Sequence, residues 1–168
     1  MIVLGVDPGL NATGYGVMSV TGGQLRVLAA GEIRTPKGQP LATRLEQLHH
    51  ELSDLITRYH PATMVIETVF THHRYPSTAA LMAHARGVAC LAAQSHGLEL
   101  AEYSPARMKK ALTGNGNASK TQVARMVGQW LGRDDTALSA DATDALALAI
   151  AHVHMASQRQ RLPVGAVG

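Results

Sequence analysis

Two short apolar runs, each ending in an acidic residue, constrain the fold of this 168-residue chain more than any other feature. Ile2–Val6 leads into Asp7-Pro8-Gly9, and Met64–Ile66 leads into Glu67. A continuous apolar run that ends at a polar turn is typical of a strand buried on both faces. If the two strands are parallel neighbours, Asp7 and Glu67 meet at one sheet edge, where open α/β sheets place their sites.

The rest of the periodicity predicts an α/β fold in which helices cover both faces of a mixed sheet. Thr13–Val20 and Gln24–Arg34 are expected to be strands joined by a Gly22-Gly23 hairpin turn, and Leu98–Tyr103 a further strand. Helical patterns occupy Leu41–Leu55, Ser77–Ser95, a short segment opening at Ser104-Pro105, a segment capped by Ser119, and Ala140 to about Ala156. We expect one domain over residues 1–156 and a flexible tail over 157–168.

Composition places the chain among compact globular proteins. Hydrophobic residues make up 46% and charged residues 16%, which excludes a disordered or collagen-like chain. The single cysteine, Cys90, excludes a disulfide framework and a cysteine zinc cluster, and it indicates a reducing cytoplasm. The apolar start is too short to span a bilayer and lacks the features of a signal peptide, so we expect a cytoplasmic protein without a membrane partner.

Positive charge is concentrated in the second half of the chain. The net charge is only +3, yet the segment Tyr103–Arg133 holds six cations and no acid. Such segregation favours a polyanionic partner, and a solvated basic face without a ligand remains the alternative.

Four carboxylates in three segments suggest where chemistry takes place. Besides the two strand-end acids, Asp141 and Asp144 lie three apart near the start of the last helix, so both project from one face. Converging carboxylates repel one another unless a cation lies between them, and oxygen ligands without cysteine select Mg²⁺ or Mn²⁺. Two such ions, roughly 4 Å apart, can activate water and stabilise the leaving oxygen of a phosphodiester. Taken singly, each acid is also compatible with an ordinary turn or helix start.

Five motifs, in order, resemble the RuvC family of bacterial Holliday-junction resolvases, which have a ribonuclease-H-like fold. The motifs are Val6-Asp7-Pro8-Gly9, Thr13-Gly14-Tyr15-Gly16-Val17, Ile66-Glu67-x-Val69-Phe70, Ala85-Arg86-Gly87-Val88 and Asp141-x-x-Asp144-Ala145-Leu146-Ala147. The resemblance extends from about residue 2 to residue 156. It implies a mixed five-stranded sheet with helices on both faces.

The resemblance also implies an activity. A homodimer of this family would use metal-dependent hydrolysis to nick two opposed strands of a four-way DNA junction, giving 5′-phosphate and 3′-hydroxyl ends, in homologous recombination and DNA repair. Asp7, Glu67, Asp141 and Asp144 match the family's catalytic, metal-holding acids, with two Mg²⁺ or Mn²⁺ ions expected per site. The branch-migration complex of RuvA and RuvB is the implied protein partner.

Expected DNA contacts carry over from the same resemblance. Phe70 matches the position from which the family contacts the junction, and Lys109 and Lys120 match basic residues near the scissile phosphate. Arg107 and Lys110 extend this basic track, and Arg74 is a further candidate for contact with phosphate. The segment Thr71–Ser77 departs from the family pattern, which puts local DNA contacts there in doubt.

Three other functions are compatible with parts of this pattern. A different ribonuclease-H-like nuclease would share the acids, and a non-catalytic junction-binding protein would retain them without using them. A sugar-kinase or actin-like ATPase also has an Asp-x-Gly after its first strand, but it needs a second such triplet, and Asp7-Pro8-Gly9 stands alone.

Overall fold

Five strands form one mixed sheet in the computed structural model, which describes residues 1–68, 76–132 and 138–161. The strands are β1 (Ile2–Asp7), β2 (Ala12–Thr21), β3 (Gln24–Arg34), β4 (Thr63–Glu67) and β5 (Glu99–Tyr103). Their order across the sheet is β3-β2-β1-β4-β5. β2 pairs antiparallel with both β1 and β3, and β1 pairs parallel with β4. The predicted meander followed by a crossover is therefore confirmed.

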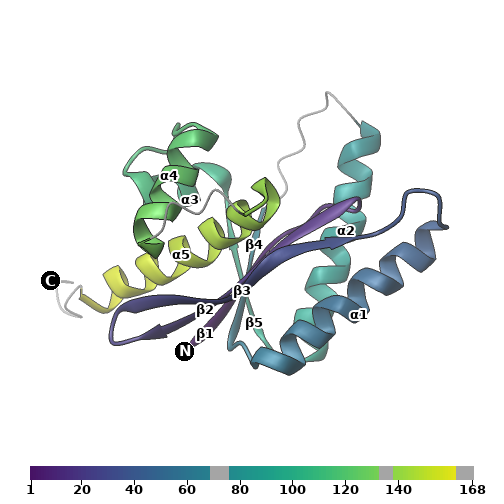
Figure 1. The fold of residues 1–168 in the computed structure, drawn as a ribbon, viewed down its shortest axis with the longest axis horizontal. Helices are drawn as coiled ribbons and strands as arrows, with labels where there is room; N and C mark the ends of the chain where they lie inside the picture. Colours follow the sequence, from purple (N-terminus) through teal and green to yellow (C-terminus); the bar gives the residue numbers. More distant parts are fainter. Residues whose placement is uncertain (69–75, 133–137, 162–168) are drawn as a thin grey trace, which may run out of the picture.

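Helices cover both faces of this sheet. On one face lie α1 (Leu41–Tyr59) and α2 (Pro76–Ser95); on the other lie α3 (Pro105–Thr113), α4 (Lys120–Leu131) and α5 (Ala140–Arg161), as Figure 1 shows. Each face has its own apolar core. Leu48 and Leu52 of the predicted helical pattern, together with Ile56, belong to the core under α1 and α2, while Ala147, Ala149 and Ala151 of α5 belong to the other core.

Local sequence signals set most helix ends. The Ser119 side chain accepts a hydrogen bond from the backbone of Gln122, whose own side chain accepts from the Ser119 backbone, completing the predicted capping box of α4. Ser139 likewise accepts from the Ala142 backbone N–H at the start of α5. α5 continues to Arg161, past the end predicted near Ala156, and the remaining tail residues 162–168 lie outside the described residues.

Strand alternation directs Asp7 and Glu67 toward the face of the sheet that α5 covers. In β1 and β4, Val3 and Val65 pack in the core under α5, so Asp7 and Glu67, which lie an even number of residues further on, face the same way. Val6 pairs with Ile66 in the parallel register, which brings the two acids side by side at the carboxyl ends of their strands. α5, which carries the other two acids, lies over this face.

Candidate active site

The four predicted acids form one electrostatic cluster at the carboxyl ends of β1 and β4. All four are partly buried, and the ionised Asp144, Glu67 and Asp141 each act on Asp7. Burial and then these neighbours raise the pKa of Asp7 from 3.8 to about 7, against a smaller opposing effect of Lys120. A cation that comes between Asp7 and its acidic neighbours would stabilise the ionised form of the Asp7 carboxyl group.

Glu67 responds to the same surroundings. Burial, and next the charge of Asp144, raise its pKa, while Lys109 and Lys120 oppose the shift. The Lys109 ammonium on α3 therefore lies within electrostatic range of Glu67, as its predicted role requires. The backbone of Glu67 is held from the other face, because Arg86 of α2 donates from Nε to the Glu67 carbonyl at 3.4 Å and pairs with Glu102.

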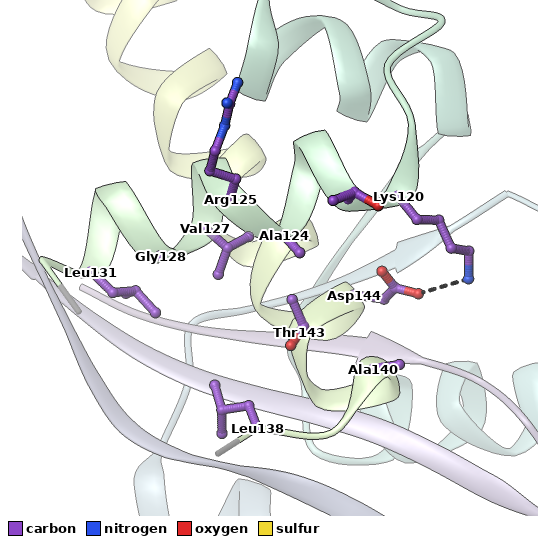
Figure 2. A pocket seen from close by; sticks show the side chains of 11 residues that line it. Lys120, Ala124, Arg125, Val127, Gly128, Leu131, Leu138, Ala140, Thr143 and Asp144 are labelled. Atoms are coloured by element: carbon purple, nitrogen blue, oxygen red, sulfur yellow. Dashed lines mark hydrogen bonds and ion pairs between the residues drawn. The ribbon is translucent and has the colours of Figure 1, made fainter. Parts of the chain in front are cut away.

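Lys120 makes the closest contact with the acids. Its Nζ lies 3.2 Å from Oδ2 of Asp144, and Figure 2 shows this ion pair bridging the start of α4 and the first turns of α5. The Coulomb attraction of Asp144 raises the pKa of Lys120, so the ammonium stays charged. The capping box places Lys120 at the first residue of α4, and its side chain remains 85% exposed. It is therefore free to exchange Asp144 for a second anion.

A cavity of about 510 Å³ opens between α4 and α5 beside this ion pair. Val127, Leu131 and Leu138 contribute apolar side chains to its lining, and Lys120 and Asp144 line the end where the ion pair lies, as Figure 2 shows. The cavity therefore touches the acid cluster through Asp144, whereas Asp7, Glu67 and Asp141 are not among its lining residues.

The donor set suits a hard divalent cation. It consists of carboxylate oxygens, and the burial and mutual repulsion that raise the pKa of Asp7 would both be relieved by a cation among them. Across residues 1–68, 76–132 and 138–161, however, no three His, Cys, Asp or Glu side chains are already gathered into a metal site. The acids lie within electrostatic range of one another without forming a closed set of ligands. Holding a cation requires these side chains to draw together.

The expected DNA-contacting residues are distributed unevenly. Lys109 and Lys120 lie at the acid cluster, whereas Lys110 and Arg107 are exposed on α3 and are not among the charges that perturb Asp7 or Glu67. The Arg107 guanidinium lies over the ring of Tyr103, 5.1 Å from its centroid. Phe70 and Arg74 fall outside the described residues.

Sequence reasoning missed the glycines that seat α5 on the sheet. A Cβ on Gly5 would overlap the carbonyl oxygen of Ala145, and one on Gly14 would overlap that of Asp141. Gly14 pairs with Asp7 across β1 and β2, so the close approach of α5 occurs beside the acid cluster. Gly14 appeared in the sequence only as part of a motif; the contact that explains it is tertiary.

In metal-free protein, the free energy of unfolding of the wild type is expected to fall relative to Asp7→Asn as the pH rises. The Asp7 carboxyl ionises near 3.8 when unfolded and at about 7 when folded, so the folded state holds the extra proton between these values and loses that stabilisation as pH rises through 7. Over this pH range, the free energy of unfolding of the wild type relative to Asp7→Asn is expected to fall by at most about 4 kcal/mol.

Chemical denaturation in EDTA at about pH 4.5 and about pH 8 measures this difference. Glu51→Gln, which removes an exposed carboxylate on α1, serves as the control. An Asp7→Asn variant that gains no stability over the wild type between the two pH values would contradict the predicted burial and repulsion.

Comparison with known proteins identifies the family. The family model described as "Crossover junction endodeoxyribonuclease RuvC" matches residues 3–152. The crossover junction endodeoxyribonuclease RuvC of Alkaliphilus oremlandii is 42% identical over 154 residues, covering 92% of this chain and 93% of its own. The Thermus thermophilus RuvC structure superposes with a TM-score of 0.87 at 31% identity, covering 95% of this chain and 97% of its own.

A second structure of the Thermus thermophilus protein, in complex with a Holliday junction substrate, gives a TM-score of 0.88 at 31% identity and covers 95% of this chain and 96% of its own. Three findings agree on the family. The family model matches most of the chain, the relative is similar over most of its own length, and the ribonuclease-H-like fold is shared. The chain belongs to the RuvC family of crossover junction endodeoxyribonucleases.

Proposed function

We propose that this chain resolves four-way DNA junctions by hydrolysis, with Asp7, Glu67, Asp141 and Asp144 as its catalytic acids. One observation carries the proposal: acids from two parallel strands and from α5 meet at a single sheet edge, where burial first and then the charges of Asp144, Glu67 and Asp141 raise the pKa of Asp7 to about 7. Family membership and the Thermus thermophilus relative in complex with a Holliday junction substrate support the four-way junction as the substrate.

The RuvC family is metal-dependent, and we propose Mg²⁺ or Mn²⁺, two per site, as the ions these acids hold. When bound, the ions would supply an activated water molecule and charge stabilisation at the departing 3′ oxygen. The all-oxygen donor set and its unrelieved negative charge support this choice.

The chain's own residues have distinct tasks in the reaction. The four carboxylates would hold the ions, and no side chain acts as a nucleophile. Lys120 and Lys109 offset the negative charge of the cluster, which lowers the repulsion between the acids and an incoming phosphodiester. Lys120 would exchange its ion pair with Asp144 for a phosphate oxygen. Hydrolysis would form a bond from a water oxygen to phosphorus and break the bond to the 3′ oxygen, which takes up a proton, so that a 5′-phosphate and a 3′-hydroxyl remain.

Further DNA contacts and partners belong to the same proposal. Phe70, Arg74, Arg107 and Lys110 would contact the junction around the cut. A homodimer would present two matching sites to the near two-fold symmetric junction, and the exposed Leu81, Met82 and Leu91 of α2 support that helix as its interface. The branch-migration complex of RuvA and RuvB would deliver the substrate, in the cytoplasm. None of the helices in the described part of the chain is long and apolar enough to cross a membrane.

The decisive experiment maps cuts on a mobile four-way junction by denaturing gel electrophoresis. With Mg²⁺ or Mn²⁺ we expect paired nicks in opposed strands, and with EDTA none. An RNA–DNA hybrid duplex of the same sequence is the comparison substrate. Cleavage of the hybrid in preference to the junction, or binding without nicking under every metal, would overturn the proposal.

Lys120→Ala is expected to lower the junction cleavage rate about 10- to 100-fold while changing stability by less than about 1 kcal/mol. The exposed ion pair with Asp144 contributes little to folding, but its loss leaves the acid cluster without its nearest cation. Single-turnover cleavage and thermal melting measure the two effects. Lys37→Ala, which removes another exposed lysine, is the matched control. A large fall in melting temperature for Lys120→Ala would show a structural role instead.

A further inference from the structure

A buried arginine lies beneath the loop that follows Asp7. Arg44, in the first turns of α1, is only 7% exposed. Its guanidinium donates from Nη2 to the carbonyl oxygen of Leu10 at 3.0 Å and to Oδ1 of Asn11 at 2.8 Å. From Nε it donates to Oγ1 of Thr35 at 3.1 Å. All three partners are neutral acceptors.

This arrangement is costly for folding. Within the described residues, none of the ion pairs includes Arg44, so its buried charge is compensated by hydrogen bonds alone. A buried charge without a counter-charge destabilises the folded state more than an apolar side chain of the same size does. The presence of a charged fork at this buried place points to a task other than stability.

That task is visible in what the hydrogen bonds hold. The loop Pro8–Asn11 joins Asp7 at the end of β1 to β2. Arg44 donates hydrogen bonds to the last two residues of this loop. Thr35, which is also buried, donates to the same Leu10 carbonyl. At the start of the loop, Thr13 donates from Oγ1 to the Gly9 carbonyl at 2.7 Å and accepts from the Gly9 N–H at 3.3 Å. The loop is therefore fixed at both ends by buried side chains.

We propose that Arg44 is a positioning residue for the nuclease site, because it locks the β1–β2 loop and so holds Asp7 and the backbone beside it in place for the scissile phosphate. The inference rests on the proposed function. Arg44 acts through geometry, since it is not among the charges that perturb Asp7. Lysine cannot replace it fully, because a single ammonium lacks the planar fork that reaches Thr35 and the loop together.

Arg44→Met separates this role from overall stability. Methionine fills a similar space and removes the uncompensated charge, and the Leu10 carbonyl keeps its hydrogen bond from Thr35. Leu52→Ala is the matched control: Leu52 lies on the same helix, is fully buried in the core that also contains Leu10, and makes none of the side-chain hydrogen bonds that hold the loop. It is expected to lower the melting temperature at least as much as Arg44→Met.

Two measurements on the full-length protein test the proposal. In hydrogen exchange of the metal-free protein, Arg44→Met is expected to speed exchange of the amides of residues 9–13 by about 10-fold or more, while Leu52→Ala leaves their rate relative to the rest of the sheet unchanged. In single-turnover junction cleavage below both melting temperatures, Arg44→Met is expected to lose about 30-fold and Leu52→Ala less than about 3-fold. Arg44→Lys is expected to fall between Arg44→Met and the wild type in both.

Unchanged exchange in the loop, or a cleavage loss for Arg44→Met no greater than that of Leu52→Ala, would overturn the proposal. If Arg44→Met does not fold, Thr35→Val removes one partner of the same fork and is judged by the same two criteria. Failure of the wild type to cut junctions would refute the proposed function instead, and the exchange experiment would still decide whether Arg44 locks the loop.

Discussion

Replacing Asp7 with asparagine is expected to abolish junction cleavage, on the order of 10³-fold or more, while junction binding is retained or strengthened. Asp7 is the member of the cluster on which the other three acids act together, and its pKa is raised to about 7. Asparagine keeps the shape of the side chain but removes the negative charge that would hold a divalent cation. The same loss of charge reduces the repulsion felt by the phosphates of the DNA, so binding does not suffer.

Cleavage is measured under single-turnover conditions with Mg²⁺ and with Mn²⁺, and binding by gel shift in Ca²⁺ or EDTA. Asp54→Asn makes the same chemical change at an exposed position on α1 and is expected to leave both properties unchanged. Circular dichroism verifies the fold of each variant. If Asp7→Asn loses binding together with cleavage while remaining folded, Asp7 serves DNA recognition rather than catalysis.

The fold was predictable because its main signals are local. The apolar runs of β1 and β4, the hairpin turn between β2 and β3, and the capping residues Ser119 and Ser139 each specify an element within a few neighbouring residues. The end of α5 was not predicted, because the polar stretch after Ala156 carries no apolar periodicity although the backbone continues as a helix to Arg161.

The acids of the site were predictable for a related reason. Each stands at the end of a strand or the start of a helix, and the parallel pairing of β1 with β4 follows from the crossover between them. Their assignment as catalytic and metal-holding residues stays a prediction. Membership in the RuvC family decides against an ATPase, and the acids' mutual electrostatic effects favour a working nuclease over a protein with vestigial acids.

Residues that position the acids were beyond the reach of the sequence. Arg44 lies four and eight residues before Leu48 and Leu52, which puts it on the apolar face of α1, but the long side chain of an arginine on such a face is ordinarily expected to reach solvent. Its burial results from the meeting of α1 with the β1–β2 loop and with Thr35, just after β3. Arg86 donates to the Glu67 carbonyl, and its place in an alanine-rich helix likewise gives no sign of this contact. Both contacts join segments distant in sequence.

The close packing of α5 on β1 gives the second prediction with a large effect: adding a single methyl group at Gly5 is expected to destabilise the protein. Gly5 faces α5 in the middle of β1, and a Cβ there would overlap the Ala145 carbonyl oxygen and come within 3.2 Å of the Ala149 backbone nitrogen. These are backbone atoms of a helix, so they cannot move aside as the tip of a flexible side chain can. The fully buried alanines of α5 leave no slack elsewhere along this contact.

Gly5→Ala is therefore expected to destabilise the protein by about 3 kcal/mol or more, at the upper end of what overpacking usually costs. Any surviving folded protein must lift α5 from the sheet, and since α5 carries Asp141 and Asp144, its cleavage activity should fall even where its melting transition remains cooperative. Urea denaturation measures the loss, and Gly38→Ala, which adds the same methyl group in open space, should change stability by less than about 0.5 kcal/mol. The contact between Gly5 and α5 also sets the distance between the acids of the helix and those of the sheet. A loss of stability below about 1 kcal/mol for Gly5→Ala would therefore mean that α5 does not rest on β1 as closely as the site requires.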